Sequence, residues 1–164
     1  MKVAVFKIGA LGDVLMSTPF VRQLHNKYSN ITYFTGVPSV LKNNPSIKHT
    51  KQVDPCIFTQ KSILGLYHLT RQLRKYDVIY ILDKHWIFSL LAWIARVPVR
   101  IGFARDWPSR LFLTTYIPYK QVRHEINYYL DLLDNPDYTD TDIDFYVSSN
   151  AEQSVTDFLK KHHI

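Results

Sequence analysis

The chain has 164 residues, which is enough for one domain with a hydrophobic core and too few for two ordinary domains. Apolar residues make up 46% of it and aromatic residues 14%, so a disordered chain is excluded. The net charge of +6 favours an anionic partner, which could be a nucleic acid, a phosphorylated sugar or an acidic membrane surface. Cys56 is the single cysteine, which excludes a disulfide framework and a thiolate metal cluster and favours a reducing, cytoplasmic setting.

The apolar segments are short. The first nine residues, MKVAVFKIG, are interrupted by lysine, and we expect no secretory leader there. The longest apolar run, WIFSLLAWIA at 86–95, has about half the length that a bilayer crossing requires. We therefore expect a buried helix at this run.

Short β-rich runs alternate with helical patterns over the first two thirds of the chain. Strands are expected at 3–8, 31–36, 49–53, 77–83 and 99–103, and helices at 14–28, 39–42, 62–74 and 86–96. Pro19 interrupts the first helix, which either kinks there or restarts with Thr18 as its cap. The alternation predicts an α/β fold, a Rossmann-like parallel sheet with helices on both faces.

The last third of the chain is different. A helix is expected at 125–133, and it leads into a stretch rich in aspartate up to Asp144. The carboxylates of this stretch lack the spacing of a calcium loop, so we expect a solvated loop or linker. Asn150 and Gln153 then predict a capping box at the start of a final helix.

The turn after the first strand carries the strongest functional signal. FKIGALGDVLMSTP, at 6–19, places two glycines and an aspartate where a doubly wound sheet binds its ligands, at the carboxyl ends of the strands. The dinucleotide fingerprint is incomplete, because Lys7 stands in place of its first glycine and no acidic residue ends the second strand. There is also no G-x-x-x-x-G-K-[ST] loop. A nicotinamide or ATP site of the usual kind is disfavoured.

Asp13 has two interpretations from spacing alone. As a helix N-cap it would satisfy backbone N–H groups and stabilise the helix by about 1 kcal/mol. As a general base it would take a proton from a substrate hydroxyl in the crevice, for a rate gain of about a hundred- to ten-thousand-fold. Gly9 and Gly12 likewise fit either a close approach of backbone to ligand or a simple turn requirement.

Three motifs together resemble glycosyltransferase family 9, the lipopolysaccharide heptosyltransferases. KIGALGDVLMSTPFVRQL at 7–24 is similar to the amino-terminal signature of the family. YDVIYILD followed by SLLAWIARVPVRIGF resembles its next signature, and RHEINYYLDLL at 123–133 resembles its later H-x-x-x-x-Y-L-x-L-L helix. Lys7 departs from the pattern, since the family more often has arginine there.

The resemblance implies the amino-terminal half of a GT-B architecture. Residues 1–147 would form the acceptor-side Rossmann-like domain, and residues 148–164 a linker helix toward a carboxy-terminal donor domain that this sequence lacks. The co-substrate, a nucleotide-sugar that is usually ADP-heptose, would bind on that missing domain. No metal and no cofactor are expected on this one.

The function that the resemblance implies is acceptor binding for an inverting glycosyltransferase. The acceptor would be an anionic glycolipid or sugar of the lipopolysaccharide core. The isolated chain is expected to be inactive, with the donor domain supplied by the full-length protein or by another chain. The implied location is the cytoplasm, with at most peripheral contact at the inner face of the membrane.

The resemblance also assigns roles to residues. It implies that Asp13 is the base that deprotonates the acceptor hydroxyl. The loop facing the acceptor or a phosphate would comprise Lys7, Gly9, Ala10, Leu11 and Gly12. Candidate acceptor contacts, each after a strand or in a loop that can reach the crevice, are Asp83, Lys84, Arg105, Arg110 and His124, with Arg100 and Arg123 as further cations. Both His124 and His85 also fit ordinary structural roles.

Two other function classes compete with an acceptor domain. One is a non-catalytic Rossmann-like interaction module, or a truncated half-enzyme, that pairs with a partner chain. The other is charge-driven nucleic-acid binding. We expect no nucleic-acid partner, because the basic residues form no stripe and no helix-turn-helix or RNA-binding motif is present.

Overall fold

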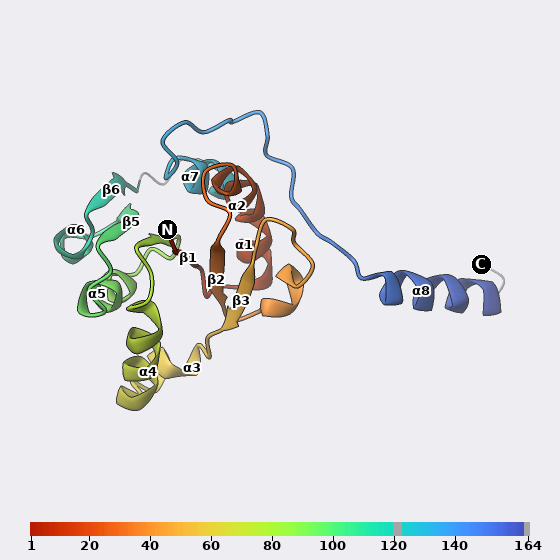
Figure 1. The fold of residues 1–164 in the computed structure, drawn as a ribbon, viewed down its shortest axis with the longest axis horizontal. Helices are drawn as coiled ribbons and strands as arrows, with labels where there is room; N and C mark the ends of the chain where they lie inside the picture. The colour runs from red at the N-terminus through yellow and green to blue at the C-terminus, as the bar shows by residue number, and fades with distance from the viewer. Residues whose placement is uncertain (120–122, 163–164) are drawn as a thin grey trace.

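The computed structural model describes residues 1–119 and 123–162 and shows six parallel strands in the order β3-β2-β1-β4-β5-β6 (Figure 1). The strands are β1 (Val3–Phe6), β2 (Ile31–Thr35), β3 (His49–Gln52), β4 (Val78–Ile81), β5 (Val99–Ala104) and β6 (Thr115–Pro118). The predicted Rossmann-like α/β fold is confirmed. β1 lies in the middle of the sheet, with β2 on one side and β4 on the other.

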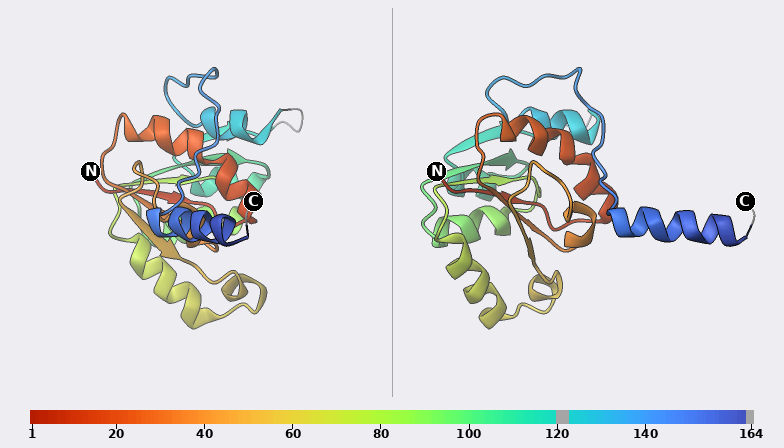
Figure 2. Two further views of the ribbon diagram at one scale, coloured as in Figure 1. Left: turned by 90° about the vertical axis from the view of Figure 1, so that its right-hand side faces the viewer. Right: turned by 45° about the vertical axis from the view of Figure 1, so that its right-hand side comes forward.

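Two layers of helices cover the sheet, and in both views of Figure 2 α2 and α7 lie on one side of the strands and α4 on the other. The helices are α1 (Leu11–Met16), α2 (Thr18–His25), a 3-10 turn η1 (Pro38–Leu41), α3 (Cys56–Thr59), α4 (Ile63–Leu73), α5 (Trp86–Ile94), α6 (Trp107–Phe112), α7 (Glu125–Leu130) and α8 (Ser149–Lys161).

The alternation of side chains along β1 divides the core between the two layers. Val3 and Val5 pack into the cluster that includes α1, α2 and α7, whereas Ala4 and Phe6 pack into the cluster that includes α4 and α5. Both clusters are buried, and all four β1 side chains are at most 1% exposed. A strand buried on both faces reads as a continuous apolar run, which is why VAVF is recognisable in the sequence.

Two helices, α1 and α2, stand in place of the single helix expected at 14–28, and Ser17 separates them. Ser17 occupies the N-cap position of α2, and its hydroxyl forms hydrogen bonds with the Val14 carbonyl and with the hydroxyl of Tyr33. The prediction of Thr18 as the cap is wrong by one residue. Thr18 is instead the first residue of α2, and its hydroxyl donates to the carbonyl of Leu15.

Two further differences concern the second half of the chain. α6 and β6 were not expected, and β6 is an edge strand of four residues beside β5. The final helix begins earlier than its predicted capping box. Ser148 is the N-cap, and its Oγ accepts a hydrogen bond from the N–H of Ala151, so the box at Asn150 is wrong.

The aspartate-rich segment after α7, residues 131–147, is called the acidic strap here. It was expected to be a solvated linker, but it lies along α2 before leading to α8, as Figure 1 shows. Its ion pairs with α2 and the residues just after α2 are Arg22–Asp140, Arg22–Asp144 and Lys27–Asp134. Near the end of the strap, the N–H of Asp144 donates a hydrogen bond to the hydroxyl of Thr18 at 2.8 Å. Three aspartates of the strap therefore pair with cations in α2 and just after it.

α8 projects away from the sheet and its two helix layers (Figure 1). Each of its residues is exposed, including the apolar side chains of Val155, Phe158 and Leu159. The division into a domain at 1–147 and a linker helix at 148–164 stays a prediction. Within the described residues, no helix has both the length and the apolar character needed to cross a membrane.

Candidate functional site

The candidate site lies where the strand order reverses. The chain moves from β1 to β2 in one direction and then returns to β4 on the other side of β1, so the carboxyl ends of β1 and β4 form the topological switch point. Open α/β sheets bind ligands in the crevice at such a point. Lys7 follows β1 and Asp83 follows β4, while α1 carries Asp13 over the same edge.

Lys7 is buried between two carboxylates. Its side chain is 7% exposed, and its Nζ lies 3.0 Å from Oδ1 of Asp83 and 3.2 Å from Oδ2 of Asp13. The other oxygen of Asp83 accepts a hydrogen bond from the N–H of Ile8 at 2.7 Å. A charge in a low-dielectric interior is tolerated only when it is paired and hydrogen-bonded. Lys7 is thus positioned to hold Asp13 and is not available on the surface.

Asp13 is the accessible carboxylate of this group. Its side chain is 41% exposed, against 12% for Asp83. The N-cap interpretation is wrong, because Ala10 occupies the N-cap position of α1 and no side chain caps it. Asp13 lies in the first turn of the helix, where the helix dipole favours negative charge. Its carboxylate is oriented by Lys7 and remains open to solvent.

Gly9 and Gly12 differ in what an added side chain would meet. A Cβ at Gly9 would come within 2.9 Å of Asp13 Oδ2 and 3.0 Å of Lys7 Nζ, so a side chain there would disrupt the ion pair. Neither glycine has a positive φ, so the turn itself does not demand them. A Cβ at Gly12 would meet no atom within 4 Å. Gly12 is exposed, so the chain next to Asp13 carries no side chain toward solvent at this position.

Two buried tyrosines lie close to the carboxylates, and sequence reasoning missed both. Tyr33 shares a hydrogen bond with Ser17, and the ring of Tyr129 lies 5.9 Å from Lys7 Nζ. Burial raises the pKa of Tyr33 and of Tyr129, and the nearby carboxylates Asp13 and Asp83 raise both further. Both phenols therefore stay neutral. The position of Tyr129 in the NYYL motif was the one available signal.

Lys84, a candidate acceptor contact, is engaged within the protein. Its Nζ pairs with Glu125 on α7 and donates to the hydroxyl of Tyr119 at 2.9 Å. Burial opposes the charge of Lys84, but the hydrogen bonds to Glu125 and Tyr119 outweigh it and raise the pKa of the ammonium. Lys84 therefore ties α7 to the carboxyl edge of β4.

The two candidate histidines cap helices. Nδ1 of His124 accepts a hydrogen bond from the N–H of Ile126 at the start of α7, and His85 does the same for Ile87 at the start of α5. These contacts match the structural roles considered for both residues. The acceptor contact assigned to His124 stays a prediction.

The arginine candidates separate into engaged and exposed side chains. Arg100 donates to the carbonyl oxygens of Val97 and Phe112, and Arg123 pairs with Asp131 at 2.6 Å. Arg105 and Arg110 are exposed and form no ion pair with any described carboxylate. These two arginines remain the cations able to meet an external anion near this edge of the sheet.

Comparison with known proteins gives matches among solved structures. The sequence matches no family model and no curated protein. The glycosyl transferase family 9 structure from Veillonella parvula is 25% identical with a TM-score of 0.83, and the match covers 99% of this chain and 49% of that one. Escherichia coli ADP-heptose lps heptosyltransferase II is 19% identical with a TM-score of 0.70, over 97% of this chain and 50% of that one.

A third match is the Escherichia coli heptosyltransferase WaaC with ADP-2-deoxy-2-fluoro heptose. It is 17% identical with a TM-score of 0.65, and the match covers 80% of this chain and 47% of that one. The chain thus has the fold of a glycosyltransferase-like domain. The family that it resembles is glycosyltransferase family 9, as the motifs predicted. It spans about half the length of the solved structures that it matches.

Proposed function

We propose that the chain is the acceptor-binding domain of an inverting glycosyltransferase and that Asp13 is its general base. The observation that carries this proposal is the arrangement at the switch point. Of the two carboxylates that Lys7 holds, Asp13 is the one that solvent reaches. A catalytic base must be both fixed and accessible, and this carboxylate is both.

The acceptor hydroxyl would approach Asp13 past Gly12, which is exposed and has no side chain. Its proton passes to the carboxylate of Asp13 while its oxygen forms a bond to the anomeric carbon of the donor sugar. The bond from that carbon to the diphosphate breaks on the opposite side, and the diphosphate leaves with the electron pair. Lys7 keeps the carboxylate in place throughout, so the proton transfer needs no rearrangement of the protein.

The substrates follow from the resemblance and from the named structures. ADP-heptose is proposed as the donor and the lipopolysaccharide core as the acceptor, since two of the similar structures are heptosyltransferases. The donor would bind outside these residues. The alternative, a non-catalytic module that pairs with another chain, is favoured by the exposed apolar side chains of α8.

The test is an NMR titration of the 15N-labelled chain with heptose-free lipopolysaccharide-core oligosaccharide. We expect weak binding, with shift changes confined to residues around Gly12, Asp13 and Asp83. Gly12→Val fills the open space and should abolish these changes without loss of fold. Ala151→Val on the exposed helix α8 is the matched control and should change nothing.

Three results would contradict the proposal. They are the absence of shift changes at saturating oligosaccharide, sub-micromolar affinity for ADP in calorimetry, and turnover of an ADP-sugar by the purified chain. The last two would place the donor chemistry on these residues. Asp13→Asn should keep the oligosaccharide affinity within about threefold, because a base acts in the transition state and not in ground-state binding.

A further inference from the structure

The balance of cations and carboxylates is uneven along the chain. Residues 55–113, which form α3 to α6 and the strands between them, contain nine lysines and arginines and three aspartates. The three aspartates already accept hydrogen bonds within the protein: Asp77 from the N–H of Lys2, Asp83 from Ile8 and Lys7, and Asp106 from the N–H of Ser109. Three carboxylates offset only part of the positive charge, so residues 55–113 carry a formal net charge of +6.

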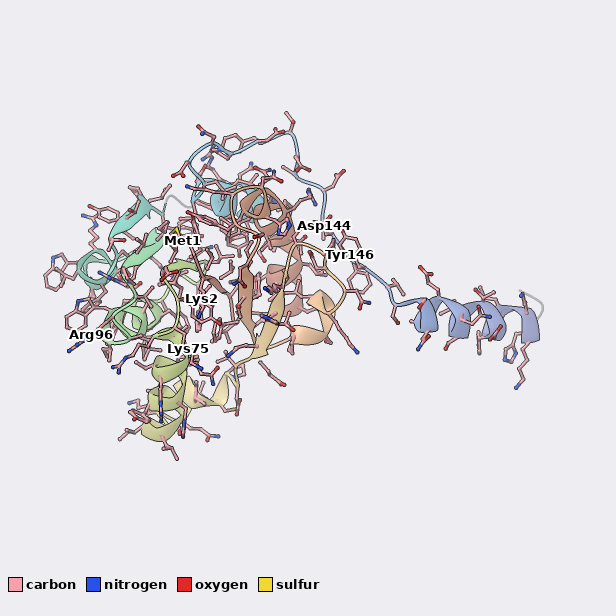
Figure 3. The ribbon with its side chains drawn as sticks, in the orientation of Figure 1. Met1, Lys2, Lys75, Arg96, Asp144 and Tyr146 are labelled. Carbon is pink, nitrogen blue, oxygen red and sulfur yellow. The ribbon has the colours of Figure 1, made fainter. Side chains whose placement is uncertain are left out.

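Seven of the nine cations are exposed and lack an ion-pair partner among the described carboxylates. They are Lys61, Arg71, Arg74, Lys75, Arg96, Arg105 and Arg110. Figure 3 shows Lys75 and Arg96 on the side of the sheet away from Asp144 in the acidic strap. Uncompensated cations concentrated on one face attract an anionic surface.

The same helices expose large apolar side chains. The exposed set consists of Ile63, Leu64 and Tyr67 on α4, Trp93 and Ile94 on α5, and Trp107 and Leu111 on α6. Ile63 is 85% exposed and Trp107 is 70% exposed. The rings of Trp93 and Phe112 lie 5.6 Å apart, so the end of α5 packs against α6. We call the outer surface of these three helices the α4–α6 face.

A hollow of ≈ 570 Å³ lies on this face between the end of α5 and the start of β5. Apolar side chains and arginines line it together: Trp93, Ile94, Arg96, Val97, Pro98 and Arg100. Arg100 is bonded to backbone carbonyls, whereas Arg96 is exposed. An acyl chain or a headgroup with a negative charge fits such a lining better than a fully polar ligand does.

We propose that the α4–α6 face binds the surface of an anionic lipid bilayer. Apolar side chains flanked by lysine and arginine are the composition of segments that lie in a membrane interface. Tryptophan and tyrosine favour the headgroup level, and each basic residue near an anionic surface contributes attraction that salt screens. The charge complementarity selects the anionic lipid as the partner.

The aliphatic side chains argue against the other anionic partner, nucleic acid. Bases stack on flat rings and phosphates need cations, so neither has a use for exposed Ile63, Leu64 or Ile94. In a bilayer interface these side chains enter the acyl boundary and gain from leaving water. The surface proposal depends on none of the residues assigned to acid–base chemistry, so it can fail while the proposed function of Asp13 stands.

The test is co-sedimentation of the full chain with sucrose-loaded vesicles at low ionic strength. We expect binding to vesicles of phosphatidylglycerol and phosphatidylcholine, little binding to phosphatidylcholine alone, and weakening with added salt. The double variants Arg96→Gln with Arg110→Gln and Trp107→Ser with Leu111→Ser should each lower the partition coefficient by about tenfold or more.

The matched control variants remove cations and an apolar side chain that lie outside the α4–α6 face. Lys42→Gln with Lys48→Gln removes two exposed cations near η1 and β3, and Phe158→Ser removes an apolar side chain of α8 that is 57% exposed. Both should bind as the wild type does. Thermal denaturation of each variant confirms that the fold is retained.

The proposal is overturned if the chain stays in the supernatant with anionic vesicles at low salt, or if the controls lose as much binding as the face variants. It is also overturned if sedimentation equilibrium without lipid shows a dimer that Trp107→Ser with Leu111→Ser dissociates, since the face would then bind a second copy. If the chain binds labelled RNA more tightly than it binds anionic vesicles, the α4–α6 face is assigned to nucleic acid.

Discussion

The two helix layers differ in whether their lysines and arginines have ion-pair partners. On the side of α1, α2 and α7, three cations pair with aspartates of α1, of the residues after β4 or of the acidic strap: Lys7, Arg22 and Lys27. In and next to α4, α5 and α6, seven exposed cations have no ion-pair partner among the described residues. A cation that is paired contributes to folding, whereas an unpaired cation on the surface is available for binding.

The difference does not lie in how the helices pack against the sheet. Both layers bury their inner faces against the sheet, with Phe20 and Leu24 on one side and Leu69 and Leu73 on the other. Substituting cations should therefore destabilise the protein on the first side and leave its stability unchanged on the second. The next two predictions test that contrast, and a third concerns the acidic strap alone.

The largest effect is expected at Lys7. Lys7→Met leaves the carboxylate of Asp83, which is 12% exposed, without its cation, and we expect a loss of about 3 kcal/mol in the free energy of unfolding. Lys75→Met removes an exposed lysine from the other side and should change stability by less than about 0.5 kcal/mol. Urea denaturation measures both, and equal effects would contradict the contrast.

A smaller effect is expected at Arg22. Arg22→Met removes both ion pairs to the strap, Asp140 and Asp144, and should cost about 1 kcal/mol because the arginine is partly solvated. Limited proteolysis should then cut the strap first. Arg110→Met, on the exposed face, should leave the cleavage pattern unchanged, and a strap equally resistant in both variants would show that Arg22 does not hold it.

The smallest effect is the acid sensitivity of the strap. Hydrogen bonds from the hydroxyl and the N–H of Thr139 lower the pKa of Asp137 from 3.8. A depressed pKa in the folded state contributes stability above the unfolded value, and that contribution disappears as the pH falls through the folded value. The free energy of unfolding, measured between about pH 5 and pH 2, should fall as this contribution is lost. Thr139→Val should remove most of that pH dependence, because it removes the hydroxyl that bonds to Asp137.

The fold was largely predictable because local patterns determine it. Strands buried on both faces give runs such as DVIYILD, and the turn glycines mark the end of the first strand. The position of Asp13 at the carboxyl edge followed from that order alone. α6 and β6 escaped prediction because each is short, and β6 is an edge strand with a mainly exposed TYIP sequence.

The site itself was less predictable because its contacts join distant residues. Lys7 and Asp83 are 76 positions apart, and no spacing rule links them. The hydroxyl of Ser17, at the N-cap position of α2, shares a hydrogen bond with the hydroxyl of Tyr33 on β2, a partner that a local motif cannot reveal. The strap looked like a linker because its partners, Arg22 and Lys27, lie more than 100 residues earlier.

The attachment of the strap through side chains has a consequence for the order of folding. Its contacts with Thr18 and Arg22 join residues 118 to 126 positions apart. Closing a loop of that length costs conformational entropy, and within the described residues the strap has no strand or helix pairing to offset the cost. α2 must already be formed before the strap can find it. The strap is therefore the segment that docks last and detaches first, and its backbone amides should exchange with deuterium while those of β1 remain protected.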